Sequence, residues 1–579
     1  MKELDDIAIR IAGANGDGIE TSGEVLARVL KSAGYNIFAY RSYQSIIRGG
    51  HVWYQVRFGS RELHSFKDKA DILIAINQDA IDNQIDHLSN DAVIIYDSKK
   101  MSIDKYKDRK IRFLDIPMLD ISIENGGDPV LRNIVGIGAA LRLCNVDISY
   151  LNDYITKRFS KKGETVVNNN ISCAREGYSR ATPLFNVKAD PKVKDLYLIN
   201  GNEALALGAF AANCRFYAAY PMTPASSILH WFAANADKGI VVKQTEDEIA
   251  AINAAIGAAS AGARAMCGTS GGGFSLMVEA LGLAGMIEVP LVVVESQRAG
   301  PSTGLPTKTE QGDLLFVAHA SQGDFPRVVM SPRSVREGFY MGAQAFNLAE
   351  KYQCPVIILL DLYYSEHMRT ISIDNLDIKI ERGKLIKEKS YNGRFKRYSL
   401  EEDGISYRSI PGTPGLEFVA PSDEHDEYGN LISDYYAGID QYVELRRKMH
   451  EKRMRKIDTM IKQENIFKPE IEKEGDIYLV TFGSTTESAR EAIIEFEKQS
   501  SYKIGLISFP YLLPLDKDKT RDMLKDKNLI DVECNYSGQL AQLIAANTGV
   551  VIKDSIRKYD GEAMTEQYII DRLNQIVKR

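Results

Sequence analysis

The stretch that decides the fold reads QTEDEIAAINAAIGAASAGARA (244–265), CGTSGGGFSLMVEALGLAGM (267–286) and EVPLVVVESQR (288–298). Its first segment predicts a helix, because Ala, Ile and Gly run on without a proline and small side chains allow close helix packing. Gly268–Gly273 predict a glycine-rich turn, where a backbone can approach a ligand closely. A second helix at Phe274–Ile287 leads into the apolar run 290–295, which is typical of a buried parallel strand. Acids at a helix start, a glycine turn and a cation after a strand indicate a ligand site in an open α/β sheet.

The composition sets the class of protein. A chain of 579 residues is too long for one hydrophobic core, so three or four domains are expected. Charged residues make up 26% and hydrophobic residues 44%, as in ordinary globular proteins. The net charge of −6 argues against a nucleic-acid partner, which would need a basic stripe. The acidic start of the chain does not resemble a secretory signal, and no apolar run reaches membrane-spanning length without a polar break. We therefore expect a cytoplasmic protein with no membrane association.

Cysteines and histidines give no metal motif. The six cysteines stand singly without a CxxC pair, and the eight histidines form no HExxH or HxH pair. This pattern suits reduced cytosolic thiols. It argues against an iron–sulfur cluster or a zinc site built by this chain alone, so we predict no metal ligands in this chain.

Residues 1–185 predict a first α/β domain with a doubly wound sheet. A strand, a glycine turn and an amphipathic helix open the chain, and apolar strands follow at Ile72–Ile76 and Val93–Tyr96. The glycines of the turn do not fit GxGxxG, so a nicotinamide site has weak support. The helix start could hold a phosphate, with Arg48 free to meet an anion, or it could be a plain tight turn.

Gly16-Asp17-Gly18 invites a different interpretation. It resembles the GDG that begins the magnesium-diphosphate motif of thiamine diphosphate enzymes, but that motif needs an Asn about 25 to 30 residues on to complete the oxygen ligands. No Asn lies between Arg41 and His51. We interpret this GDG as the turn of a different domain and expect no magnesium ligands in this chain.

A polar, proline-containing linker at 185–195 precedes a second α/β domain at 196–383. Within it, Pro221-Met222-Thr223-Pro224 predicts a stiff turn at the carboxyl end of a strand. The two prolines hold Thr223, so its hydroxyl is preorganised to meet a substrate. Residues 384–475 predict a charged connector, and residues 476–579 a third domain that alternates strands and helices.

Several motifs together resemble the alpha subunit of the 2-oxoacid:ferredoxin oxidoreductases. They are GNEALALGA (201–209), YPMTPAS (220–226), 244–265, TSGGGFSLMVEALG (269–282) and RAGPSTGLPTKTEQGDL (298–314). Residues 1–185 resemble the gamma subunit, fused ahead of alpha, and 476–579 resemble the transketolase-C-type domain that ends alpha. GISYRSIPGT (404–413) and DEHDEYG (423–429) resemble the 2-oxoglutarate-type, broad-specificity branch. Family members usually read YPITPSS, and here Met222 and Ala225 replace the Ile and the first Ser.

The resemblance implies a three-domain α/β chain: a gamma-type doubly wound domain, a pyrimidine-type thiamine diphosphate domain and a transketolase-C-like domain. It implies CoA-dependent oxidative decarboxylation of a 2-oxoacid, 2-oxoglutarate or pyruvate, to acyl-CoA, CO₂ and reduced ferredoxin. Thiamine diphosphate would be shared with a beta subunit that supplies Mg²⁺ and a [4Fe–4S] cluster. Coenzyme A would be the co-substrate, ferredoxin a further partner, and the assembly a heterodimer or a dimer of heterodimers.

Two other functions stay open from the residues. One is a self-sufficient thiamine diphosphate decarboxylase or transketolase relative, against which the incomplete GDG motif counts. The other is a non-enzymatic protein that binds CoA or a nucleotide through its first domain, in which Glu248 and Arg298 would have no task.

Glu248 is the predicted catalytic and cofactor-binding acid. Thiamine activation needs a carboxylate hydrogen-bonded to the pyrimidine N1′, and the family's Ala/Gly-rich helix aligns that acid with Glu248. The alternative is structural: Thr245-x-x-Glu248 is also a capping box, with Glu248 reaching back to the helix start. Glu246 is the second choice for the activating acid, and Asp247 is a first-turn acid favoured by the helix dipole.

Arg298 and Thr223 are the other predicted catalytic residues. The guanidinium of Arg298 would grip the substrate carboxylate, unless it is a surface cation at a strand end. Thr223 would hydrogen-bond the substrate, unless it caps the next helix. The remaining predicted residues are the cofactor wall of Gly271, Gly272, Gly273 and Ser275 and the substrate-binding Tyr220, Ser302 and Thr303.

Three features of the later chain are interpreted more simply. The basic helix 445–462 predicts a solvated face. Arg408 is a candidate contact for a dicarboxylate substrate. Glu533 and Asn535, at a strand end, are expected to be structural.

Overall fold

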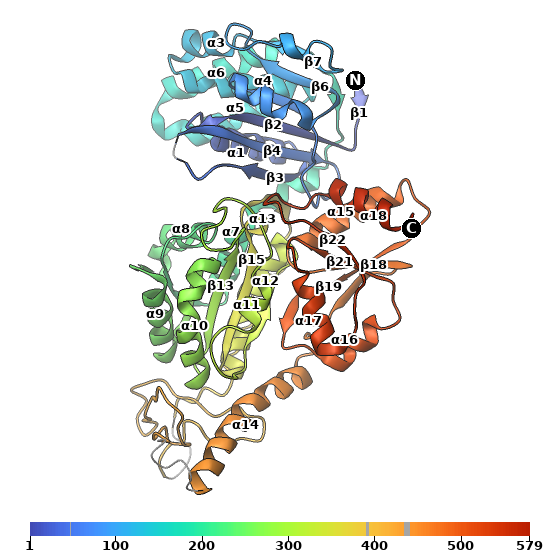
Figure 1. The fold of residues 1–579 in the computed structure, drawn as a ribbon. Coiled ribbons are helices and arrows are strands. Elements are labelled where there is room, and N and C mark those ends of the chain that lie inside the picture. The colour runs from blue at the N-terminus through green and yellow to red at the C-terminus, as the bar shows by residue number, and fades with distance from the viewer. Residues whose placement is uncertain (47, 389–392, 433–439, 579) are drawn as a thin grey trace. The chain divides into compact units, whose positions relative to one another are not determined.

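The computed structural model describes residues 1–46, 48–388, 393–432 and 440–578, which form two compact units (Figure 1). Unit 1 comprises Met1–Asn200, Glu366–Ile373 and Thr565–Asp571. Unit 2 comprises Gly201–Ser365, Asp374–Met564 and Arg572–Arg579. Each unit combines sheets with helices, which confirms the α/β class.

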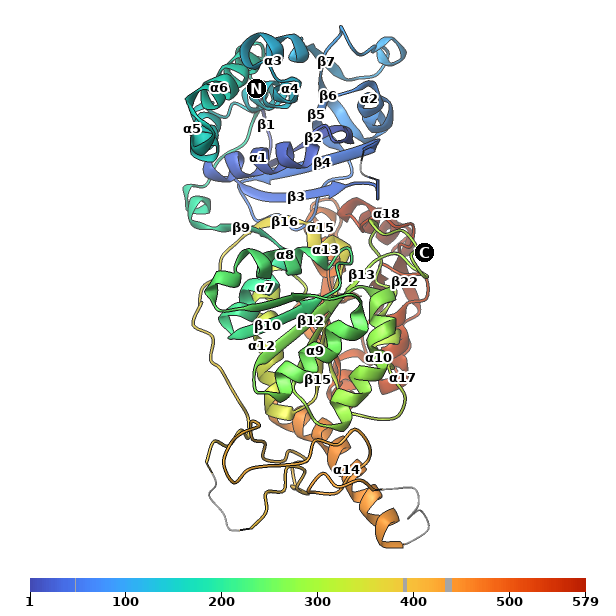
Figure 2. The same cartoon turned by 90° about the vertical axis from the view of Figure 1, so that its left-hand side faces the viewer.

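Unit 1 contains an eight-stranded sheet of order β7-β6-β5-β2-β4-β3-β16-β9 (Figure 2). The strands from β2 to β7 in this order are parallel, and those from β4 to β9 are antiparallel to their neighbours. The expected strands at Ile72–Ile76 and Val93–Tyr96 form β5 and β6. The strand bounds are β2 Asp6–Asn15, β3 Asn36–Ser42, β4 Gly49–Gly59, β5 Ala70–Ala75, β6 Leu88–Tyr96, β7 Arg112–Asp115, β9 Tyr197–Asn200 and β16 Met368–Ile371. A short pair, β1 Lys2–Glu3 with β8 Phe185–Asn186, lies beside it.

The first helix of unit 1, α1 (Ile19–Ser32), is amphipathic. In this helix, Val25, Leu26, Val29 and Leu30 are buried, as their helical spacing predicts. The helix bounds are α1 Ile19–Ser32, α2 Gln78–Gln84, α3 Met118–Gly126, α4 Arg132–Leu143, α5 Ser149–Phe159 and α6 Glu164–Ser179.

Unit 2 contains a seven-stranded sheet of order β11-β10-β12-β13-β15-β14-β20. Its first six strands are parallel, and β20 is antiparallel to β14. The bounds are β10 Cys214–Ala219, β11 Val241–Gln244, β12 Arg264–Thr269, β13 Leu291–Gln297, β14 Val328–Met330, β15 Pro355–Asp361 and β20 Tyr511–Leu513.

Both faces of this sheet are buried, as the apolar run 290–295 predicts. In β13, Leu291 and Val293 belong to one core with helices α9 (Glu248–Ser260) and α10 (Gly271–Met286). Val292 and Val294 belong to a second core with α7 (Gly201–Ala211), α8 (Ser226–Ala234) and α12 (Val335–Tyr352). Alternate residues of one strand thus face opposite helix layers. Figure 1 shows α9 and α10 together beside the sheet.

The remaining elements of unit 2 include a second sheet. Its order is β17-β19-β18-β21-β22, and only β17 is antiparallel to its neighbour. No helix in the described part of the chain is long and apolar enough to cross a bilayer. The bounds are α7 Gly201–Ala211, α8 Ser226–Ala234, α9 Glu248–Ser260, α10 Gly271–Met286, α11 Leu314–Ala318, α12 Val335–Tyr352, α13 Leu362–Glu366, α14 Asp440–Gln463, β17 Glu470–Lys473, β18 Ile477–Thr481, α15 Thr485–Glu497, β19 Ile504–Ser508, α16 Lys517–Leu524, β21 Leu529–Glu533, α17 Gln539–Thr548, β22 Asp554–Arg557 and α18 Glu566–Ile576.

The basic helix α14 does not present a purely solvated face, so that prediction is wrong. Lys452 and Lys456 are fully buried, and both pair with the buried carboxylate of Glu288. Burial acts to raise the pKa of Glu288, but the charges of Lys452, Lys456 and Arg397 outweigh it and hold the pKa well below its usual range. The sequence shows the charges of this helix but not the acid, 164 residues away from Lys452, that neutralises them.

Arg408 is likewise structural, which corrects its interpretation as a substrate contact. It is 4% exposed, and its guanidinium pairs with Glu350 at 2.9 Å. Arg264 and Arg382 bind the same carboxylate. Glu350 is therefore the centre of a buried arginine cluster that attaches the connector to α12.

Removing one member of the buried Glu288 cluster should destabilise unit 2. Lys452→Ala leaves a buried carboxylate short of a partner, which costs about 3–5 kcal/mol. Urea unfolding followed by circular dichroism measures the loss as a lower midpoint. Lys448→Ala, an exposed lysine on the same helix, is the matched control and should leave the midpoint unchanged. Equal midpoints for both variants would contradict the assignment.

Candidate functional site

The predicted site residues converge at the carboxyl edge of four neighbouring parallel strands. Glu248 follows β11, Thr223 follows β10, Gly271–Gly273 follow β12, and Arg298 follows β13. Because parallel strands end at the same edge, these segments are neighbours although 75 residues separate Thr223 from Arg298.

Glu248 is buried without a partner at the start of α9. Its side chain is 3% exposed, and among the described residues its Oε1 atom has no hydrogen-bond partner. The helix begins at Glu248 itself and is capped by Asp247, whose carboxylate accepts from the Ala250 N–H at 2.8 Å. The Thr245–Glu248 capping box is therefore wrong, because Thr245 donates its hydroxyl to the Asp247 carbonyl instead. A buried carboxylate oxygen that does not cap the helix is available to a ligand.

Gly273 allows the first turn of α10 to approach that carboxylate. A Cβ at this position would lie 2.4 Å from Glu248 Oε1 and 2.0 Å from Thr269 Oγ1, which is closer than atoms can approach. The glycines 271–273 are thus helical and do not form the loop that the sequence predicts. Gly271 and Gly273 serve close approach to Asp313 and to Glu248, since their backbone is helical and needs no glycine conformation, whereas Gly272 faces open space.

Arg298 and Thr223 are in contact. The Arg298 Nη1 donates to the Thr223 carbonyl oxygen at 2.9 Å, and this is its only hydrogen bond to the described residues. Burial lowers the pKa of Arg298, and no acidic group counteracts it. Thr223 does not cap α8, whose cap is Ala225 without a side-chain bond, so the capping alternative is wrong. A half-buried arginine with free donors and no counter-ion can bind an anion.

The other predicted residues lie at the periphery of this edge. Tyr220, Gly272 and Ser275 are exposed, and the Ser275 hydroxyl donates to the Gly271 carbonyl. Ser302 and Thr303 are exposed on the loop after β13, and no contact joins them to Glu248 or Arg298.

A carboxyl pair that the sequence analysis missed lies behind the glycines. Glu295, on β13, is fully buried, and neither of its oxygens has a donor among the described residues. Burial and the charge of Asp313 raise the pKa of Glu295 well above its usual range, and burial raises the pKa of Asp313 to about 6. Two adjacent carboxylates can only accept, so the pair is satisfied when Glu295 keeps a proton and donates it to Asp313. An acid inside the apolar run 291–295 was the available signal.

Asp17 stabilises the glycine turn of unit 1, Gly16-Asp17-Gly18. Asp17 accepts from the Ala14 N–H at 3.0 Å and pairs with Arg132 at 2.9 Å. The exposed Arg48 side chain passes beside Gly16. Phosphate binding at this turn stays a prediction.

Glu533 and Asn535 are structural, as expected, because Glu533 accepts from the Leu540 and Ala541 N–H groups and from Asn535.

A methyl group at Gly273 should displace the Glu248 carboxylate. Gly273→Ala places its Cβ against Thr269 and Glu248, an overpacking that costs about 1–3 kcal/mol. Gly272→Ala is the matched control one residue away, where a Cβ meets nothing within 4 Å; it should stabilise slightly, since Ala favours a helix. Thermal unfolding of both variants checks this order, and the reverse order would disprove the close approach.

The carboxyl pair predicts a pH dependence of stability. The folded pKa of Asp313, about 6, exceeds its ordinary value of 3.8, so the folded state binds the proton more tightly and stability falls as pH rises from 4 to 6. Asp313→Asn removes this loss and should stabilise unit 2 at pH 8 by up to about 3 kcal/mol, with the gain vanishing near pH 4. Urea unfolding at both pH values measures it. Glu279→Gln, at an exposed acid of α10, should show no such trend, and a pH-independent gain for Asp313→Asn would refute the pair.

Two family models and a solved structure match this chain. Residues 207–444 match the family model described as pyruvate flavodoxin/ferredoxin oxidoreductase, thiamine diphosphate-binding. Residues 8–180 match pyruvate ferredoxin/flavodoxin oxidoreductase. A solved structure of 2-oxoglutarate:ferredoxin oxidoreductase from Magnetococcus marinus, with 2-oxoglutarate, coenzyme A and succinyl-CoA bound, is 32% identical with a TM-score of 0.89, over 99% of each chain.

One relative of known name extends over nearly the whole chain, and another extends over part of it. The 2-oxoacid:ferredoxin oxidoreductase subunit alpha of a Sulfolobus species is 31% identical, over 98% of this chain and 96% of the relative. The 2-oxoglutarate synthase subunit KorA of Archaeoglobus fulgidus is 34% identical, over 60% of this chain and 90% of the relative. The chain therefore belongs to the alpha subunits of the 2-oxoacid:ferredoxin oxidoreductases, and it is one subunit of a multi-subunit oxidoreductase.

Proposed function

We propose that this chain supplies the pyrimidine half of a thiamine diphosphate site in an enzyme that oxidises a 2-oxoacid with coenzyme A. The carboxylate of the substrate leaves as CO₂, its acyl group forms a thioester with the CoA thiol, and ferredoxin accepts the electrons one at a time. The observation that carries the proposal is the buried Glu248 Oε1, which has no hydrogen-bond partner in the part of the chain that the structure describes and lies directly beside the glycine start of α10.

Glu248 would hold the cofactor's pyrimidine ring. Its free oxygen can accept a hydrogen bond from a protonated ring nitrogen, and its burial strengthens that bond because water does not compete. Gly271–Gly273 would form the wall beside the ring, with Ser275 at the rim. When bound, thiamine diphosphate supplies a nucleophilic carbon and a sink for the electrons that decarboxylation releases.

Arg298 would bind the substrate. Its unused N–H donors and permanent charge suit the carboxylate that every 2-oxoacid carries. Thr223, whose carbonyl fixes Arg298, would direct its hydroxyl to the same substrate. Tyr220, Ser302 and Thr303 would line the entrance. The relative with 2-oxoglutarate bound favours 2-oxoglutarate, with pyruvate as the second candidate.

The missing parts of the site would come from a partner. We propose a beta subunit that holds the diphosphate through Mg²⁺ and carries a [4Fe–4S] cluster, in a cytoplasmic heterodimer or dimer of heterodimers. Apolar side chains next to the site support a covering chain: Ile249 on α9 is 49% exposed and Leu276 on α10 is 51% exposed.

The direct test is anaerobic isolation of the tagged chain from its native cells. Viologen reduction with CoA and a panel of 2-oxoacids should be CoA-dependent and accompany a smaller partner that contains CxxC pairs. A lone chain that decarboxylates without an electron acceptor would overturn the proposal and favour a self-sufficient thiamine enzyme.

Removing the Glu248 charge should abolish most turnover. Glu248→Gln keeps the shape but weakens proton handling at the ring, which should lower kcat about 10²- to 10⁴-fold in the purified complex. Glu246→Gln, at an exposed acid two residues earlier, is the control and should retain activity. Unchanged turnover in Glu248→Gln would leave Glu248 as a structural acid.

Replacing Arg298 should affect 2-oxoacid binding specifically. Arg298→Met loses a charge-assisted hydrogen bond of about 1.5–3 kcal/mol, so the KM for the 2-oxoacid should rise roughly tenfold to hundredfold while the KM for CoA stays constant. Arg336→Met, at an exposed arginine of α12, should change neither. A parallel rise in both KM values would indicate a structural defect instead.

A further inference from the structure

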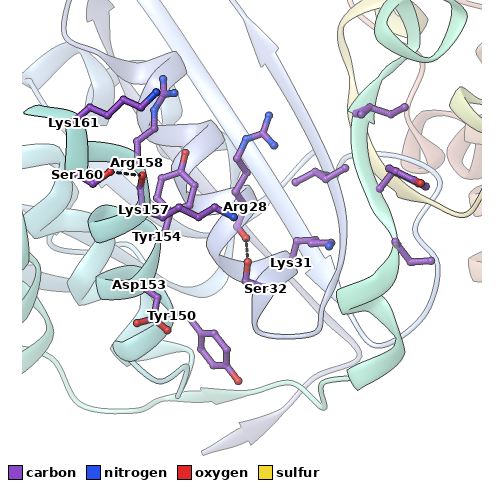
Figure 3. Close-up of a pocket in the computed structure, with 14 residues that line it drawn as sticks. Arg28, Lys31, Ser32, Tyr150, Asp153, Tyr154, Lys157, Arg158, Ser160 and Lys161 are labelled. Atoms are coloured by element: carbon purple, nitrogen blue, oxygen red, sulfur yellow. Dashed lines mark hydrogen bonds between the residues drawn. The ribbon is translucent and has the colours of Figure 1, made fainter. Parts of the chain in front are cut away.

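A groove of about 860 Å³ lies in unit 1, between the ends of α1 and α5 and the strand β9. Figure 3 shows the side chains that line it. Its volume falls in the range of small-molecule sites. All of its lining comes from unit 1, whereas the proposed catalytic residues belong to unit 2.

The groove is strongly cationic. Five basic side chains line it, against the single carboxylate of Asp153. In the part of the chain that the structure describes, four of these cations make no ion pair, and the amino group of the fifth, Lys31, donates to the Lys194 carbonyl oxygen. The unpaired four are Arg28, Lys157, Arg158 and Lys161.

Helix dipoles explain this clustering only in part. Lys31, Lys157 and Arg158 lie in the last turns of α1 and α5, where a cation offsets about half a negative charge per helix end. Five cations, one carboxylate and two helix ends leave a net charge of about +3. Arg28 lies a turn earlier and Lys161 lies beyond α5, so neither is accounted for by a helix end.

Aromatic and hydroxyl groups complete the lining. Tyr150 and Tyr154 present rings among the cations, and Ser32 and Ser160 present hydroxyls. The Lys194 ammonium stands 5.2 Å from the centre of the Tyr150 ring. Clustered cations bind phosphates, and tyrosine rings stack on bases. A hollow with both suits one molecule that carries phosphates and a planar base better than a flat acidic protein surface.

We propose that this groove binds a nucleoside di- or triphosphate. The cations neutralise its phosphates, and a tyrosine ring stacks on its base. The site is independent of the proposed function, because its ligand is recognised by residues of unit 1 and its occupancy is measured without turnover.

Isothermal titration of the full chain tests the proposal with ATP, ADP, inorganic triphosphate and CoA as separate titrants. ATP should bind saturably at micromolar to submillimolar concentration, more tightly than inorganic triphosphate, and more weakly as salt rises. Arg28→Ala with Lys157→Ala should weaken it at least tenfold. The matched control is Lys110→Ala with Arg112→Ala, which removes one lysine and one arginine at β7, the opposite edge of the sheet.

Four results would overturn the proposal. No ATP binding at 1 mM, equal loss in the two double variants, or binding of inorganic triphosphate as tight as ATP overturns the proposal. Binding of CoA alone also overturns it, since the site would then read a part of the co-substrate. Thermal unfolding of both double variants identifies a folding defect. If Arg28→Ala with Lys157→Ala is misfolded, the single variant Lys161→Ala, at an exposed position, takes its place, and it must weaken ATP binding.

Discussion

Burial of the seven-stranded sheet on both faces is the constraint on which the arrangement of unit 2 depends. Helix layers cover each face, so the strands β10 to β13 carry apolar side chains toward two cores. Polar groups are excluded from both faces and gather where the strands end. The acid, the threonine, the glycines and the arginine of the proposed site are found at this edge, although they come from four separate segments.

Within that edge, absent side chains matter as much as present ones. The missing Cβ of Gly273 lets α10 begin against Glu248, so that its Oε1 is buried without a hydrogen-bond partner among the described residues. Behind the glycines, Glu295 and Asp313 bring two carboxyl groups together in a place where a shared proton satisfies both. Unsatisfied groups of this kind cost stability, and they are retained where a ligand or a proton uses them.

Buried charge is handled differently elsewhere in the molecule. Around Glu288 and Glu350, lysines and arginines from the connector neutralise single carboxylates and fasten an irregular segment to the helices of unit 2. The groove of unit 1 is the opposite case, because four of its cations make no ion pair in the described chain. The contrast between matched and unmatched charge separates structural residues from candidates for binding.

The sequence by itself determined the α/β class, the buried strands and the helix after the glycines. Its short motifs also indicated the family. These features are local: they depend on periodicity, proline and glycine positions and short motifs. It also singled out Glu248 and Arg298, yet left a capping role open for Glu248, because a Thr-x-x-Glu spacing looks the same whether the helix begins at Glu246, after a Thr245 cap, or at Glu248. Only the tertiary structure decided that Asp247 is the cap. It alone decided that Arg408, Lys452 and Lys456 are structural, that Gly273 is needed for its missing side chain, and that Glu295 meets Asp313. These outcomes depend on contacts between residues far apart in the chain, and no local sequence pattern indicates which distant residue a side chain will contact.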